Sequence, residues 1–283
     1  MEELNTLNKK WSTIEKIDNK TELILTNKEQ NYLKNKQHIT MCIDPSWMPF
    51  ESFKDGEYIG MTADYFKIFI NDFKLPIKVI KTTNWTQSIE YAKSRKCDIL
   101  SLVMKTPERT KYLNFTTPYL KIPLVLATKH NVSFISDFKT LTDEKIGIPK
   151  GYAFIELLKT KYPNINIIEV KNLKDGLEQV NEGKLFGYIG TLASVGYMFQ
   201  TQFTGELKIA GKFDETWELG IGVRNDDPTL LSILESGVKN IKEETHRAIL
   251  NKWIAIKYEK KVDYTFLWQI LFGIFYFSPL HNL

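Results

Sequence analysis

Histidine and cysteine are scarce in this chain of 283 residues, which limits the chemistry that its side chains can carry. The two cysteines, Cys42 and Cys97, lack the close spacing that zinc sites use. Four histidines are scattered along the chain without forming a cluster, at positions 38, 130, 246 and 281. We therefore expect neither a metal site nor a cofactor.

The chain also lacks a long run of charge of one sign. Its 38 basic and 34 acidic residues are spread along the sequence and leave a formal net charge of +4. Nothing in this distribution favours nucleic acid as a partner. Hydrophobic residues make up 43% of the chain, which is enough to build one large domain or two lobes around substantial cores.

A secretory signal is not apparent at the N-terminus, because MEELNTLNKKW begins with acidic residues and has no apolar segment. The most apolar stretch lies at the other end, at residues 266–277, interrupted by Gln269 and Gly273. It is shorter than the ~20 residues that a membrane-spanning helix needs. It is either the first part of such a helix or a hydrophobic helix that packs against another subunit.

From Ile39 onwards, short apolar runs alternate with amphipathic segments, which predicts an α/β fold with mainly parallel sheets. Thr62 is expected to cap one helix, and Asp227 followed by Pro228 is expected to begin another. Strands are expected at residues 39–44, 77–80, 99–104, 124–128, 145–148, 167–170 and 186–189. Further helices are expected at residues 85–94, 173–181 and 243–258.

The same pattern suggests that the two cysteines remain reduced. If the strands at residues 39–44 and 98–102 lie side by side, Cys97 falls about two residues nearer the strand starts than Cys42. Their Cα atoms would then be roughly 8 Å apart, which is beyond the reach of a disulfide. We expect two buried thiols.

One buried strand, Ile99–Met104, ends abruptly at Thr106 and Pro107, which are typical of a helix start. Arg109 would lie in the first turn of that helix, where the helix dipole favours anions over cations. An arginine at this position is better explained if it holds an anion, and its planar fork suits a carboxylate. Alternatively, Arg109 is a surface residue paired with Glu108.

A second candidate segment, DPSWMPFE, follows the first strand. Its two prolines prevent a helix and leave Asp44, Trp47, Phe50 and Glu51 at the carboxyl end of the strand, where open α/β sheets bind their ligands. These aromatic and acidic groups could clamp a polar ligand. Alternatively, the two aromatic rings fill the core and the two acids are solvated.

Three segments together resemble a known family: residues 97–119, CIDPSWMPFE at 42–51 and LGIGVRNDDPTLLSIL at 219–234. They are similar to the bacterial extracellular solute-binding proteins of family 3. The resemblance is closer still to the Venus-flytrap sensing domains of multidomain sensor histidine kinases, and it covers about residues 39–258. It implies a two-lobed, periplasmic-binding-protein-like fold of type 2, with two mixed, mainly parallel sheets joined by two hinge strands.

The resemblance also implies a division of the chain. Residues 38–120 and 219–260 would form lobe 1, residues 121–218 lobe 2, and residues 261–283 a hydrophobic tail that begins a transmembrane segment. Residues 1–37 would be a linker and the remnant of an upstream tandem domain, since LNKKWSTI near the start is similar to LNKWIAI near residue 250. In the linker, Thr26 and Glu29 form a capping-box pattern that predicts a helix to about Lys36.

Lobe 2 contributes a weaker set of candidates. Gly151 precedes a helix, so that the backbone N–H groups of Tyr152 and Ala153 could face an anion. The family's amino-acid binders place an ammonium-binding aspartate where Thr191 stands, and threonine cannot supply that charge.

Leu102 and Met104 likewise replace small hydroxyl residues that lie beside the ligand in those binders. The amino-acid site is therefore half present, with Arg109 for the carboxylate. Either Asp44 or Glu51 supplies the missing acid, or the ligand is a carboxylate without an amine.

Together these features predict a non-enzymatic domain that binds a small carboxylate-bearing, amino-acid-like solute between two lobes and closes over it. It would be a periplasmic sensor domain, anchored to the membrane through the tail and connected to an upstream flytrap domain and downstream signalling domains. One alternative is the substrate-binding protein of an amino-acid-type ABC transporter. A further alternative is a dehydratase-like enzyme, for which Glu51 or Asp44 would act as general acid or base.

Overall fold

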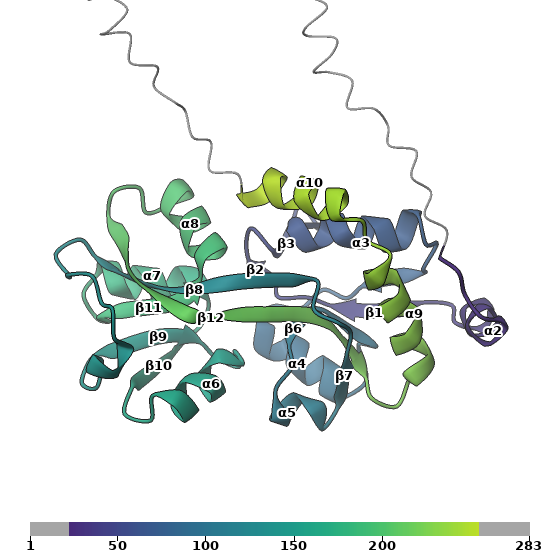
Figure 1. Ribbon diagram of the computed structural model, residues 1–283, viewed down its shortest axis with the longest axis horizontal. Coiled ribbons are helices and arrows are strands. Elements are labelled where there is room, and N and C mark those ends of the chain that lie inside the picture. The colour runs from purple at the N-terminus through teal and green to yellow at the C-terminus, as the bar shows by residue number, and fades with distance from the viewer. Residues whose placement is uncertain (1–22, 255–283) are drawn as a thin grey trace, which may run out of the picture.

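The computed structural model of the chain describes residues 23–254, which form two lobes joined by two long strands (Figure 1). The hydrophobic tail and the first 22 residues lie outside the described residues. Among the described residues, no helix has both the length and the apolar character required to cross a membrane. The strands and helices expected from the alternating pattern are present, with bounds that differ by a few residues.

Lobe 1 is built on a parallel core in which β1 lies between β5 and β6. The strands of this lobe are β1 (Ile39–Cys42), β2 (Ser46–Trp47), β3 (Glu51–Lys54), β4 (Glu57–Ile59), β5 (Ile77–Val79), β6 (Ile99–Met104) and β7 (Leu113–Phe115). Strands β2, β3 and β4 form a small separate sheet. The helices are α2 (Asn27–Asn35), α3 (Met61–Asn71), α4 (Trp85–Lys93), α5 (Pro107–Thr110), α9 (Pro228–Lys239) and α10 (Glu243–Ile254).

Lobe 2 repeats the same alternation with a second group of strands in the order β10, β9, β11. Its elements are η1 (Phe138–Thr140), β9 (Lys145–Pro149), α6 (Phe154–Lys161), β10 (Asn166–Val170), α7 (Leu173–Asn181), β11 (Gly187–Thr191) and α8 (Leu192–Thr201). Because β9 and β10 are parallel and end at the same edge, the loops that follow them face lobe 1.

The hinge consists of β8 (Leu120–Lys129) and β12 (Leu207–Arg224), which pair antiparallel with two interruptions in register. Lys121 lies opposite Glu218 in this pairing, and their side chains form an ion pair of 2.7 Å. Separate sheets in the two lobes were expected from the sequence. Hydrogen bonding instead continues from one lobe to the other through β8 and β12, which gives one nine-stranded sheet.

Both ends of the described chain are attached to lobe 1. The predicted capping box at the start of α2 is confirmed, and Tyr32 of this helix donates a hydrogen bond of 2.6 Å to Asp227 at the start of α9. At the other end, α10 lies over α3, where the indole N–H of Trp253 donates to Asp64 at 2.7 Å (Figure 1). Lobe 2 is therefore connected to the chain ends only through the hinge strands, within the part of the chain that is described.

The start of α3 differs from the expectation, because Thr62 does not cap this helix. The helix begins at Met61, and its cap is Gly60, whose φ angle is 113°. A Cβ at Gly60 would lie 2.4 Å from the carbonyl oxygen of Phe50. Glycine is required here because the backbone that leads into β3 packs directly against this turn.

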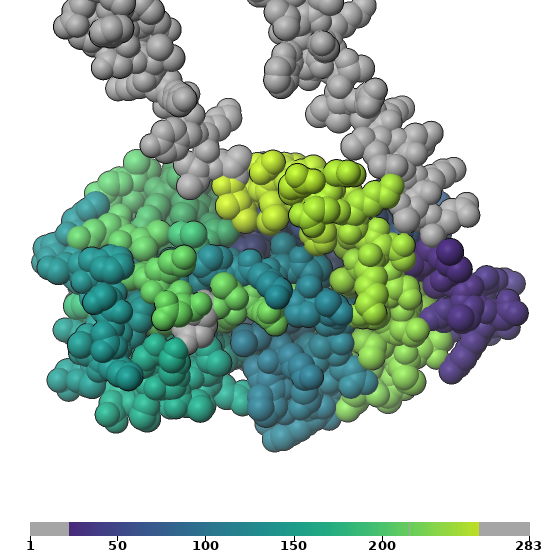
Figure 2. Space-filling model, viewed as in Figure 1, coloured from purple at the N-terminus to yellow at the C-terminus, as the bar shows by residue number. Residues whose placement is uncertain are grey.

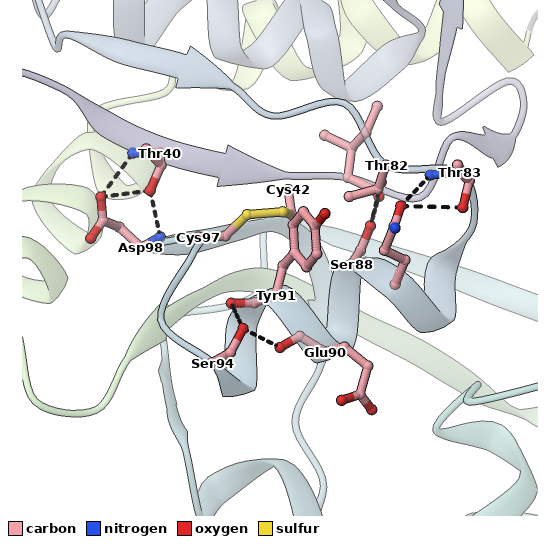
Figure 3. Close-up of a disulfide and its surroundings, with 12 residues drawn as sticks. Thr40, Cys42, Thr82, Thr83, Ser88, Glu90, Tyr91, Ser94, Cys97 and Asp98 are labelled. Carbon is pink, nitrogen blue, oxygen red and sulfur yellow. Dashed lines mark hydrogen bonds between the residues drawn. A yellow bond between two sulfur atoms is a disulfide. The ribbon is translucent and has the colours of Figure 1, made fainter.

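The expectation of two free thiols is wrong, because Cys42 and Cys97 form a disulfide (Figure 3). Their Cα atoms are 5.8 Å apart. Cys97 does not extend along the strand, since β6 begins only at Ile99. The N–H of Cys97 instead bonds to the carbonyl of Tyr91 and closes the turn after α4, so counting residues along a strand overestimates the separation.

Candidate functional site

The two lobes meet at a cleft whose lining comes from lobe 1, lobe 2 and the hinge. Seven of the ten residues proposed from the sequence line it: Asp44, Trp47, Leu102, Met104, Arg109, Tyr152 and Ala153. The other lining residues are Trp85, Val103, Trp217 and Leu219. The cavity between them has a volume of about 20 Å³ for the centre of a water molecule, which is room for about one water. The lobes are therefore closed upon each other.

Arg109 is the buried cation of this cleft. Thr106 caps α5 as predicted, and this places the Arg109 side chain, 6% exposed, toward lobe 2. Its two terminal nitrogens donate to the carbonyl oxygens of Met104 at 2.9 Å and Gly151 at 3.0 Å. The alternative of a surface arginine paired with Glu108 is wrong, because Glu108 pairs with Lys111. Burial lowers the pKa of the Arg109 guanidinium to about 10.

Asp44 is the acidic group that lines the cavity. Its Oδ2 accepts a hydrogen bond of 2.7 Å from the Tyr152 hydroxyl of lobe 2, and its Oδ1 accepts one of 3.0 Å from the N–H of Ser46. Burial raises the pKa of Asp44 to about 6, although both hydrogen bonds act in the opposite direction. The carboxylate thus contributes to the closed arrangement of the lobes.

Lobe 2 offers a carbonyl and a phenol to the cleft, which differs from the predicted pair of N–H groups. The N–H of Tyr152 is bonded to the carbonyl of Pro149 at 3.2 Å, and α6 begins only at Phe154. Gly151, with a φ angle of 79°, turns its own carbonyl toward lobe 1. That oxygen accepts from Arg109 and from the indole N–H of Trp85 at 3.2 Å.

Aromatic rings fill most of the remaining space. The rings of Trp47, Tyr152 and Trp217 are in mutual contact, with centroid separations of 5.7 to 5.9 Å. The sequence left open whether Trp47 and Phe50 clamp a ligand or fill the core. In the structure the two residues differ in position. Trp47 lines the cavity, whereas Phe50 is wholly buried in the core of lobe 1 behind it, at a centroid distance of 4.7 Å.

Glu51 and Thr191 lie outside the cavity lining. Glu51 is wholly buried in lobe 1, where it accepts hydrogen bonds from the Ser101 hydroxyl at 2.5 Å and the N–H of Asp44 at 2.8 Å. Burial raises the pKa of Glu51 to about 8. The Thr191 hydroxyl caps α8 by accepting from the N–H of Ser194. Among the described residues, no cluster of three metal-ligating side chains is present.

Sequence reasoning missed Trp85 and Trp217. Trp85 is the first residue of α4, which directly follows β5 and so starts near the same sheet edge as Asp44. That position is a signal that could have identified it. Trp217 lies within the long hinge strand, and it reaches the cleft because β12 crosses between the lobes (Figure 1). No local pattern distinguishes it from a core residue.

The cleft continues into grooves on its two sides. One groove has a volume of about 960 Å³ and lies between the start of α4 and the ends of β9 and β10. Asp44, Trp85 and Tyr152 line both this groove and the inner cavity, so the groove adjoins the cavity. Figure 2 shows a notch between lobe 2 and the α5 region below the hinge strands.

Two known proteins are similar to this chain over most of its length. The virulence sensor protein BvgS of Bordetella bronchiseptica is 22% identical over 228 residues, which cover 80% of this chain and 18% of that protein. The chain thus spans about a fifth of the length of that relative. The ABC transporter arginine-binding protein 1 of Escherichia coli is 24% identical, over 77% of this chain and 90% of that protein.

Among solved structures, the periplasmic VFT2 domain of Bordetella pertussis BvgS superimposes with a TM-score of 0.75 at 21% identity, over 81% of this chain and 99% of that domain. This likeness confirms the predicted two-lobed α/β fold. The family model for bacterial extracellular solute-binding proteins, family 3, matches residues 39–256. The chain therefore belongs to the family 3 bacterial extracellular solute-binding proteins.

Proposed function

We propose that this protein binds a small carboxylate-bearing, amino-acid-like solute between its lobes and acts as the periplasmic sensing domain of a signalling protein. The observation that carries the proposal is the buried guanidinium of Arg109. Among the described residues, no carboxylate lies within ion-pair distance of it. A buried charge without a counter-ion is costly, so a ligand carboxylate would stabilise this site.

The second charge of the cleft narrows the class of ligand. Asp44 lines the same cavity as Arg109, and both side chains are more than nine-tenths buried. A ligand with both a cationic and an anionic group would leave neither of these charges unpaired. A zwitterion is therefore favoured over a simple carboxylate. Asp44 would then bind the cationic group of the ligand, in place of the acid that is absent at Thr191.

Ligand binding would replace contacts that the lobes now make with each other. The Gly151 carbonyl accepts a hydrogen bond from one terminal nitrogen of Arg109, and the Tyr152 hydroxyl donates one to an oxygen of Asp44. A solute that bonded to these groups would shift the balance between lobe arrangements by its differential affinity for them. Because both described chain ends are attached to lobe 1, lobe 2 would move relative to whatever the ends connect to.

The test of the proposal uses Arg109→Ala and Arg109→Lys. The wild-type protein is first screened by thermal shift with L-arginine, L-glutamine, L-glutamate, glycine and succinate, because binding stabilises the native state. The affinity of each binder is then measured by calorimetry. Arg109→Ala should weaken it by about 30-fold to several thousand-fold. Arg109→Lys should recover part of the loss, since a point charge cannot reproduce the fork.

Arg247→Ala serves as a control, because Arg247 is exposed on α10, and this helix contributes no residue to the lining of the cavity or of the adjoining groove. It should leave affinity unchanged. If all four proteins bind every compound with equal affinity, Arg109 does not bind the carboxylate of the ligand. The proposed function as a whole would be contradicted if no carboxylate-bearing compound binds, either in this screen or among the N-methylated glycines described below.

The alternative of a soluble transporter receptor is supported by the arginine-binding protein of E. coli, since the similarity covers 90% of that protein. Fractionation separates the two roles. A sensor domain anchored through residues 261–283 should remain with the membrane after carbonate extraction of cells that express the full chain. Recovery in the soluble periplasmic fraction would favour the transporter role.

We also propose that binding occurs without catalysis. Asp44 is the carboxylic acid that lines the cavity, and Glu51 lies behind it in the core. Mass spectrometry of each binder after prolonged incubation should recover the compound unchanged. Conversion that Asp44→Asn abolishes would instead identify an enzyme.

A further inference from the structure

Three aromatic rings meet at the centre of the cleft, and each comes from a different part of the fold. Trp47 belongs to β2 of lobe 1, Tyr152 follows β9 of lobe 2, and Trp217 lies on the hinge strand β12. Their pairwise centroid separations of 5.9, 5.7 and 5.8 Å make a nearly equilateral triangle. Retraction of lobe 2 would withdraw Tyr152 and open a pocket walled by aromatic rings.

The carboxylate of Asp44 stands beside this triangle, because it accepts the hydrogen bond of the Tyr152 hydroxyl. Aromatic faces together with a nearby carboxylate attract organic cations, since the ring quadrupole presents negative charge to them. The face of the Trp85 ring is not available to an organic cation in the same way. The Arg109 guanidinium already lies over that ring, at 5.5 Å from its centroid.

Trp217 provides a second, independent observation, because it carries a hydrogen-bond donor without a partner. Its side chain is 5% exposed, it lines the cavity, and its buried indole N–H has no hydrogen-bond partner among the described residues. A buried donor without an acceptor is costly, and such groups in native proteins usually have a specific reason. A ligand oxygen would satisfy it.

The side chains around the cavity provide few hydrogen-bond acceptors. Among the lining residues, Asp44 and Tyr152 alone carry side-chain oxygen atoms, and these two are bonded to each other. A primary ammonium brings three N–H donors and needs acceptors for them. A quaternary ammonium brings none, and it gains its stabilisation from aromatic faces and a nearby negative charge.

We propose that the cleft selects a zwitterion of the betaine class, with a carboxylate and an N-methylated ammonium. The carboxylate would accept from Arg109 and from the Trp217 indole N–H, and the methylated ammonium would lie on Trp47 and Trp217 beside Asp44, in the space that Tyr152 opens when it retracts. This inference rests on the proposed function and specifies its ligand. Because the closed cavity admits about one water, the ligand enters only when Tyr152 retracts.

The first experiment is a methylation series on the wild-type protein: glycine, sarcosine, dimethylglycine and glycine betaine. Affinity, measured by calorimetry, should rise with each methyl group and end about tenfold or more tighter for glycine betaine than for glycine. Choline, which has the quaternary ammonium but no carboxylate, should bind more weakly than glycine betaine.

The second experiment is Trp217→Phe, which keeps an aromatic ring and removes the N–H. It should weaken glycine betaine about tenfold or more, and it should weaken choline less, because choline has no carboxylate to accept that bond. Trp253→Phe is the matched control, since the Trp253 indole N–H is bonded to Asp64 on the outer face of lobe 1. It should leave both affinities unchanged.

The outcomes separate this inference from the proposed function. If unmethylated amino acids bind in an Arg109-dependent manner and affinity falls with methylation, the function stands and the betaine assignment is overturned. An equal effect of Trp217→Phe on glycine betaine and choline would remove Trp217 from carboxylate binding. If neither the unmethylated amino acids nor the methylated glycines bind, both proposals fail. Should Trp217→Phe not fold, the methylation series on the wild type decides alone.

Discussion

Asp44 and Glu51 carry two buried carboxyl groups of lobe 1, and the backbone N–H of Asp44 donates a hydrogen bond to the Glu51 carboxyl. Burial raises the pKa of Asp44 to about 6 and that of Glu51 to about 8. The folded protein therefore retains protons that the unfolded chain has already released. Where the native state binds more protons, stability falls as pH rises, here from about pH 4 to 6 for Asp44 and from about pH 4.5 to 8 for Glu51.

Glu51→Gln should remove most of this pH dependence at neutral pH. In the wild type, the contribution of Glu51 should lower the free energy of unfolding by about 2 kcal/mol between pH 6 and pH 8. The neutral amide has no proton to release. The free energy of unfolding of the variant should therefore fall by about 2 kcal/mol less than that of the wild type over the same interval. Urea denaturation at several pH values measures both slopes.

The control for this comparison is Glu57→Gln, since Glu57 is exposed on β4. Its pH profile should match the wild type. Parallel profiles for wild type and Glu51→Gln would show that Glu51 is ionised in both the folded and the unfolded states.

At the level of elements, the disulfide fixes the end of α4 to β1, the strand that leads into Asp44. Figure 3 shows Cys97 at the turn after the helix, facing Cys42. The bridge closes a loop between residues 55 positions apart, which includes β2, β3, β4, α3, β5 and α4. Such a long loop restricts the unfolded chain strongly.

Reduction of this disulfide should lower the free energy of unfolding by about 4 kcal/mol in the chain-entropy account. The measurement is denaturation with and without dithiothreitol. A Cys42→Ala, Cys97→Ala double variant should show the lower stability and no response to the reductant. Thiol titration of the unfolded wild type should find no free cysteine, and two titratable thiols would contradict the bridge.

At the level of the whole molecule, the lobes are held together by contacts that do not involve a ligand. Tyr152 bonds to Asp44, and the Gly151 carbonyl accepts from Arg109 and Trp85. The hinge strands β8 and β12 pair on both sides of their two register interruptions, so the lobes can move by bending these strands without separating them. The balance between closed and open arrangements then depends on a few polar contacts.

Tyr152→Phe should shift this balance toward the open arrangement, because it removes the hydrogen bond to Asp44 and keeps the ring. Loss of a bond to a charged group should change the ratio of open to closed molecules by about tenfold or more. Spin labels at Thr110 of lobe 1 and Thr160 of lobe 2, both exposed, would report the change as a longer distance. Tyr162→Phe changes a residue outside the cleft and should give the same distance distribution as the wild type. An unchanged distribution for Tyr152→Phe would contradict the prediction.

The sequence by itself determined the elements whose signals are local. Helix starts at Thr26, Thr106 and Asp227 were predictable, because each cap is a contact between residues three positions apart. The alternation of strands and helices likewise placed Asp44 and Arg109 at the carboxyl ends of strands, where a cleft would form.

Only the tertiary structure decided what those residues meet. The disulfide depends on the turn after α4, and the carbonyl of Gly151 reaches Arg109 only because the lobes close. Trp217 reaches the cleft because the pairing of β8 with β12 carries it between the lobes, whereas Glu51 is buried behind Asp44 by the fold of β3 against β6. Apart from the bond between Asp44 and Glu51, these contacts join residues tens of positions apart. Their geometry is set by packing and register, which local sequence patterns do not encode.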